Sequence, residues 1–116
     1  MAGFAERFED LRIWQQVRIV ANDVYDALAD CRDYGFRDQI QRAAVSSMNN
    51  IAEDFECRTS KDFGHFLDIA KASSGEVRSM LYLAEDRKYL SAESATSMRS
   101  KACALSAGIA AFRRTL

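Results

Sequence analysis

Few residues of this chain have the types and spacing that acid–base or metal chemistry requires. The single histidine, His65, lies at helical spacing from Asp62 and Asp68, so these three side chains could share a proton or a cation. A di-iron site in a helical bundle needs two Glu-x-x-His motifs and two further glutamates, which one histidine does not provide. We therefore expect His65 to be a surface or interface residue, with a polar switch or ligand role as the alternative.

Motifs of known catalytic centres are equally sparse. The tripeptide Asp62-Phe63-Gly64 matches the magnesium motif of protein kinases, but no glycine-rich loop, strand lysine or catalytic-loop motif accompanies it. The sequence has neither a Gly-x-Ser-x-Gly elbow nor a phosphate-binding glycine loop. It therefore predicts a protein that is not an enzyme and holds no metal or cofactor.

The cysteines are odd in number and too widely spaced for a disulfide framework or a zinc motif; they are Cys31, Cys57 and Cys103.

The charged residues are distributed unevenly although the net charge is only −1. The first thirty residues contain three basic and six acidic side chains, whereas residues 89–116 contain Arg99, Lys101, Arg113 and Arg114 against the single acid Glu93. One interpretation is attraction between the first and last helices. The other is a basic patch, made of these four residues, that contacts an anionic partner such as RNA. No aromatic residue interleaves with these basic residues in the sequence, so stacking of single-stranded bases is poorly supported.

A second group of polar residues lies on or beside an apolar segment in the middle of the chain. It consists of Gln39, Arg42, Asn50, Glu53 and Arg58. Such a group can form a hydrogen-bond network on the surface or between subunits. Alternatively, it can bind a partner or a small anion.

The elements that position these residues are predicted to be helices. Proline is absent and glycine occurs only five times, which favours long helices with few turns. Apolar residues recur every three or four positions in four segments, at about 11–31, 36–55, 61–87 and 92–114. Short connections make neighbouring helices antiparallel, so we predict an all-α, up-down-up-down four-helix bundle that forms a single domain over residues 1–116. The predicted caps are Asp10, Thr59 or Ser60, and Ser91, with a break at Tyr34-Gly35.

The third segment has more apolar residues than one buried stripe requires. The second segment has small residues on a second face, namely Ala43, Ser46 and Ser47, which allow another backbone to approach closely. Surplus apolar area of this kind predicts self-association. No run of about 18 apolar residues and no signal core is present, so we expect a cytoplasmic protein that does not contact membranes.

Several motifs, in order along nearly the whole chain, resemble one family. They are FEDL at 8–11, IWQ at 13–15, YGFRDQIQRAAVS at 34–46 and NIAE at 50–53, followed by Arg58, Ser60, Phe63 and Glu76. The chain is similar to the bacterial four helix bundle protein family, also called the 23S ribosomal RNA intervening-sequence protein family. It departs from that pattern at Gln41, where arginine is usual, at Met48, where proline is usual, and at Asp54, where glycine is usual.

The resemblance implies a four-helix bundle that assembles into a homopentamer and whose biochemical role is not established. A related group, the accessory variability determinants of diversity-generating retroelements, resembles this family in fold and forms pentamers that bind nucleic acid and a reverse transcriptase. By analogy, the resemblance implies a non-enzymatic scaffold that binds RNA or a nucleic-acid-associated protein. The alternative is a protein–protein interaction module that uses the apolar face of the third helix and binds no nucleic acid.

Overall fold

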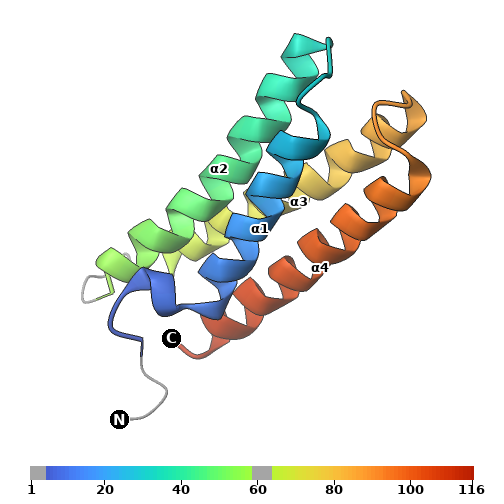
Figure 1. Ribbon diagram of the computed structural model, residues 1–116. Helices are drawn as coiled ribbons and strands as arrows, with labels where there is room; N and C mark the ends of the chain where they lie inside the picture. The colour runs from blue at the N-terminus through green and yellow to red at the C-terminus, as the bar shows by residue number, and fades with distance from the viewer. Residues whose placement is uncertain (1–4, 59–63) are drawn as a thin grey trace.

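The computed structural model describes residues 5–58 and 64–116, and within these ranges the chain forms helices without strands. Figure 1 shows that the helices run antiparallel, with the α1–α2 and α3–α4 connections at one end of the bundle and the carboxyl terminus at the other. Each helix packs against the two that neighbour it around the bundle, and α4 closes the bundle against α1. The predicted up-down-up-down architecture is thus confirmed. The elements are a short 3₁₀ turn, η1 (Phe8–Asp10), and α1 (Arg12–Ala27), α2 (Tyr34–Glu56), α3 (His65–Asp86) and α4 (Ala92–Arg114).

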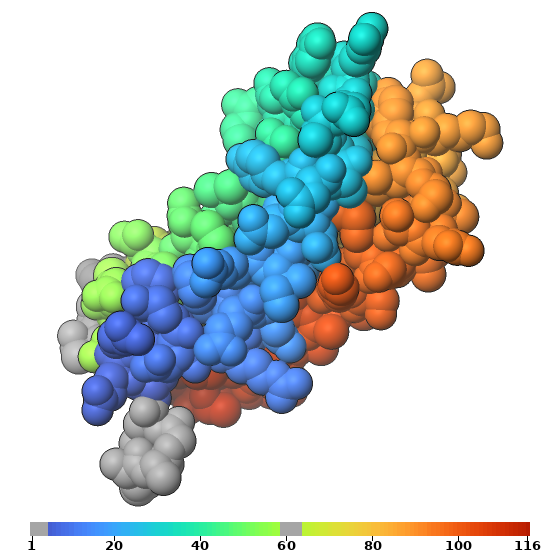
Figure 2. Space-filling view, viewed as in Figure 1, coloured from blue at the N-terminus to red at the C-terminus, as the bar shows by residue number. Residues whose placement is uncertain are grey.

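The predicted apolar stripes form one hydrophobic core along the bundle axis. Figure 2 shows how closely α1 fits between α2 and α4 on one face of this elongated molecule. Two residues outside the predicted stripe of α1, Ile13 and Val20, are also buried, whereas Trp14 is only half-buried. The largest side chains that are fully buried come from all four helices: Val17, Val24, Leu28, Ile40, Ile51, Leu67, Val77, Leu81, Leu105 and Ile109.

The first helix is shorter at both ends than predicted. Asp10 does not cap it: the cap position is Leu11, and Asp10 ends the 3₁₀ turn. This turn forms because Phe8 packs edge-to-face against Trp14, with ring centroids 5.1 Å apart, and Leu11 is buried. At the other end α1 stops at Ala27 instead of continuing to residue 31. No basic residue lies in its last turn, so nothing there offsets the negative end of the helix dipole.

The second helix begins earlier than predicted, because Asp33 caps it. The Asp33 carboxylate accepts a hydrogen bond from the Phe36 N–H at 3.2 Å, so Tyr34-Gly35 forms the first turn instead of a break. The second oxygen of Asp33 accepts a hydrogen bond from the Tyr89 hydroxyl at 2.6 Å. Tyr89 also packs edge-to-face on Phe36. Asp33 therefore joins the α1–α2 connection to the α3–α4 connection.

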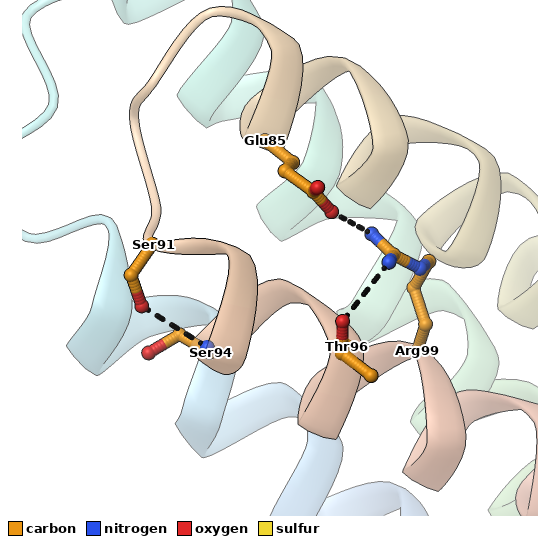
Figure 3. Close-up of polar contacts among 5 residues, drawn as sticks. All are labelled: Glu85, Ser91, Ser94, Thr96 and Arg99. Carbon is orange, nitrogen blue, oxygen red and sulfur yellow. Dashed lines mark hydrogen bonds and ion pairs between the residues drawn. The ribbon is translucent and has the colours of Figure 1, made fainter.

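The fourth helix agrees with the prediction, whereas the third begins later than predicted. Helix α4 has the predicted bounds, and the Ser91 hydroxyl accepts a hydrogen bond from the Ser94 N–H at 3.1 Å, which confirms the predicted cap (Figure 3). Helix α3 begins at His65, four residues after the predicted start. Its predicted caps, Thr59 and Ser60, lie outside the described residues. Within the described ranges, no helix combines the length and apolar character needed to cross a bilayer.

The pKa of Asp33 is predicted to control part of the pH dependence of stability. The hydrogen bond from Tyr89, followed by that from the Phe36 N–H, lowers the pKa of Asp33. A lowered pKa contributes stability above the unfolded value of about 3.9, and this stability is lost as the pH falls through the folded value. Asp33→Ala should therefore melt below the wild type at pH 7, and the difference should shrink towards pH 2. Melting temperatures measured by circular dichroism across this range test it, and a constant difference would contradict it.

Candidate nucleic-acid interface

Arg99, the first residue of the predicted basic patch, is held between α3 and α4. Its guanidinium bonds the Glu85 carboxylate at 2.8 Å and the Thr96 hydroxyl at 3.2 Å (Figure 3). The same guanidinium lies 4.2 Å from the centroid of the Tyr82 ring, and only 15% of the Arg99 side chain is exposed. Arg99 thus joins α4 to α3, and the Glu85 carboxylate neutralises its charge. Its aromatic partner was missed in the sequence, because Tyr82 is on another helix.

Lys101 points to the opposite side of α4. Its ammonium lies 2.9 Å from the Asp23 carboxylate on α1. This ion pair joins the last helix to the first, which supports attraction between the two ends of the chain as one cause of the uneven charge distribution. Because Lys101 faces α1 and Arg99 faces α3, the two cations do not form one surface.

Arg113 and Arg114 lie at the far end of α4, about 21 Å from Arg99 at the rise of an α-helix. The Arg113 Nε lies 3.3 Å from an Asp68 carboxylate oxygen on α3. Arg114 is exposed and has no ion-pair partner among the described residues. Of the four predicted contact residues, three are therefore paired within the chain, and Arg114 alone has no ion pair with a residue that the structure describes.

The predicted polar cluster does not form one network: Gln39 bonds across to α3, whereas Asn50 and Arg58 bond carbonyl groups of α2. The Gln39 amide donates to Glu76 at 3.2 Å, and the Asn50 amide donates to the Ser46 carbonyl at 2.8 Å. Arg58 folds back, donating to the Phe55 carbonyl at 3.0 Å with its guanidinium 4.3 Å from the Phe55 ring centroid. The two remaining members, Arg42 and Glu53, are exposed.

The small residues of α2 face α3 of the same chain. The buried Ser47 hydroxyl donates to the Ala70 carbonyl at 2.9 Å, and the Ser46 and Ser73 hydroxyls are 3.0 Å apart. Ala43 is buried as well. The prediction that these small residues serve self-association is therefore wrong, because the backbone that approaches them belongs to α3 of the same subunit.

Asp54, which stands where the family usually has glycine, is a buried acid beside the start of α3. One carboxylate oxygen accepts a hydrogen bond from the Gly64 N–H at 2.7 Å, while the other has no partner among the described residues. Burial raises the pKa of Asp54, and the N–H groups of Gly64, Leu67 and Phe66 act against that increase. Asp54 thus supplies from α2 the N-terminal cap that Gly64, in a left-handed conformation, has no side chain to provide.

His65 is exposed and packs edge-on against Phe66, with ring centroids 5.6 Å apart. The predicted neighbour Asp62 lies outside the described residues, and Asp68 pairs with Arg113. Across the part of the chain that the structure describes, no three His, Cys, Asp or Glu side chains gather as a metal site requires. The three cysteines are free thiols; Cys103 is exposed, and Cys31 and Cys57 are half-buried.

The fold and these contacts define a small all-α four-helix bundle whose helices are joined by polar side chains at their seams. Residues 9–111 match the family model described as 23S rRNA-intervening sequence protein. The chain belongs to this family, as the sequence motifs predicted. A comparison with curated proteins finds no significant match.

Replacing Gly64 should destabilise the protein. Gly64 has a φ of 102°, and a methyl group added there would lie 2.6 Å from the guanidinium carbon of Arg113. We expect Gly64→Ala to cost about 1–3 kcal/mol, mainly from the backbone conformation, because the arginine can move away. Urea unfolding of Gly64→Ala measures this cost. Arg113→Ala in the same background should recover little of it, and wild-type stability of the single variant would contradict the prediction.

The raised pKa of Asp54 predicts the opposite pH dependence from that of Asp33. A raised carboxyl pKa contributes stability below the unfolded value of about 3.9 and loses it as the pH rises through the folded value. Asp54→Asn keeps an acceptor for the Gly64 N–H and does not titrate. The wild type should therefore lose stability relative to Asp54→Asn as the pH rises from about 4 to 7, in denaturant unfolding at several pH values. A pH-independent difference between the two proteins would show that Asp54 does not titrate in this range.

Proposed function

We propose that this protein is a non-enzymatic, homo-oligomeric helical scaffold, pentameric as its family resemblance implies, that binds RNA or a nucleic-acid-associated protein. The observation that carries the self-association is the outer surface of α3 on the side of α2. There Ile69 and Leu83 are 37% and 48% exposed, and Phe66 and Met80 are half-buried. These four residues, which we call the apolar flank of α3, follow helical spacing and so lie on one side of the helix.

The position of the apolar flank suits a contact between identical subunits. The polar members of the same row, Ser73 and Glu76, bond Ser46 and Gln39 on α2, so the backbone beneath the flank is held by cross-helix hydrogen bonds. A rigid surface loses little conformational entropy when it docks, which favours a defined contact. The exposed Arg42 and Glu53 border this seam on α2 and provide charges of both signs for a symmetric partner.

The second candidate is a protein-binding module that uses the apolar flank for a different partner. The internal pairing of Arg99, Lys101 and Arg113 favours it, because it leaves α4 with little uncompensated charge. Salt separates the two candidates. Binding through phosphate contacts weakens steeply with added salt, whereas an apolar contact changes little.

Introducing a charged side chain into the apolar flank should dissociate the proposed oligomer. Wild-type protein is expected to show a mass near five chains of 13.1 kDa by size exclusion with light scattering. Ile69→Glu and Leu83→Glu should each shift the mass towards one chain, because an unpaired charge is buried on assembly. Ile19→Glu is the matched control, since Ile19 is 53% exposed on α1. A wild type that remains a single chain at every concentration, or an Ile19 variant that dissociates equally, would contradict the proposed face.

A further inference from the structure

The side of α3 that faces α4 carries a different set of residues. Lys71, Gly75, Arg78 and Tyr82 follow steps of four, three and four, so they form one row along the helix. This row lies beside α4, because Asp68 and Glu85 at its two ends pair with Arg113 and Arg99 of that helix. The apolar flank of α3, in contrast, adjoins α2. The two sets of residues therefore occupy different sides of α3.

The middle of the row is a shallow open groove of about 640 Å³ between α3 and α4. Its lining includes the small residues Ala72 and Gly75 on α3 and Ser106 on α4, and a methyl group added at Gly75 would meet no atom within 4 Å. An extended chain can therefore approach the backbone here. The Ser106 hydroxyl bonds Ser74 at 3.2 Å, which ties the two helices together beneath the groove.

Lys71 and Arg78 also line this groove. Both are exposed, and neither forms an ion pair with any residue that the structure describes. Seven residues of helix separate them, which is about 10.5 Å along the axis. Asp68, the one acid among the described residues that line the groove, is neutralised by Arg113. The groove thus has a local positive charge although the whole chain has a net charge of −1.

Tyr82 extends this row by one helical turn beyond Arg78. The ring is 58% exposed, and the Arg99 guanidinium lies 4.2 Å from its centroid. Arg99 is itself fixed by Glu85 and Thr96, as Figure 3 shows. A tyrosine supported in this way is a preformed surface on which a flat ring can stack. Aromatic side chains beside a cationic groove are how proteins hold single-stranded nucleic acid without reading its sequence.

We propose that the groove between α3 and α4 binds single-stranded nucleic acid. Lys71 and Arg78 contact phosphates of the backbone, Gly75 leaves room for the chain between them, and Tyr82 stacks one base. The inference rests on the proposed scaffold function and gives it a site that differs from the predicted α4 patch. Duplex DNA should bind more weakly, because its bases are not free to stack on Tyr82.

Fluorescence anisotropy with a labelled twelve-nucleotide oligouridylate tests the groove at several salt concentrations. The combined Lys71→Ala and Arg78→Ala variant should bind at least about tenfold more weakly, and its log–log salt slope should be smaller by about 1.4, the value for two phosphate contacts on a single strand. Arg12→Ala with Arg32→Ala is the matched control, because it removes the same charge from exposed arginines elsewhere. Tyr82→Ala should weaken binding about fivefold to a hundredfold, whereas Tyr82→Phe should bind like the wild type.

The outcomes separate this site from the scaffold function. Circular dichroism and light scattering of each variant establish that it folds and assembles as the wild type does. If the wild type binds the oligonucleotide but the groove variant and the control variant lose affinity by the same factor, binding is non-specific or uses another surface. That result would overturn the proposed binding site in the groove. If the wild type does not bind at low salt while it still assembles, the groove is overturned and the self-associating scaffold stands. Equal affinity for a twelve-base-pair duplex, unaffected by Tyr82→Ala, would overturn the role of Tyr82.

Discussion

Helices α2 and α3 lie so close together that the buried Ser47 hydroxyl donates to the Ala70 carbonyl at 2.9 Å. A hydrogen bond of this kind contributes only about 1 kcal/mol, but small residues at the contact let the two backbones approach. The approach brings Asp54, two turns further along α2, to the N-terminus of α3, where it accepts the Gly64 N–H. Ile69 and Leu83, on the side of α3 that adjoins α2, lie outside this contact and remain exposed on the outer surface.

The charges of α4 are distributed by the same packing. Arg99 and Arg113 pair with α3, and Lys101 pairs with α1, so the basic excess of the last helix holds the bundle together at three points. Arg99 is the least exposed of the three, and partly buried pairs of this geometry are screened less by salt than exposed ones. Among the described residues, Arg114 at the end of α4 has no ion pair, and neither do Lys71 and Arg78, which α3 contributes to the surface beside α4. Local charge on this surface is thus a property of two neighbouring helices, and the net charge of either helix alone does not describe it.

The sequence was sufficient for the number, order and direction of the helices, because each stripe repeats over several turns. It was also sufficient for the Ser91 cap, which depends on residues three apart. It failed at the starts of α1 and α2. Asp10 does not cap α1 because Phe8 packs on Trp14, and α2 starts at Tyr34 because Asp33 both caps Phe36 and bonds Tyr89. The aromatic partner of Arg99 was also missed, because Tyr82 lies on another helix.

The two sides of α3 have complementary properties for a scaffold. The apolar flank adjoins α2, where cross-helix hydrogen bonds from Gln39 and Ser46 hold the backbone. The cationic groove adjoins α4 and ends at Tyr82. In the proposed oligomer, assembly through the first side would leave the second open, and each added subunit would repeat the groove. The proposed two phosphate contacts and one stacked base would bind only weakly at one site. Several such sites on one ring would raise the effective concentration of a long strand, so avidity would compensate for the small local charge without any further basic residue.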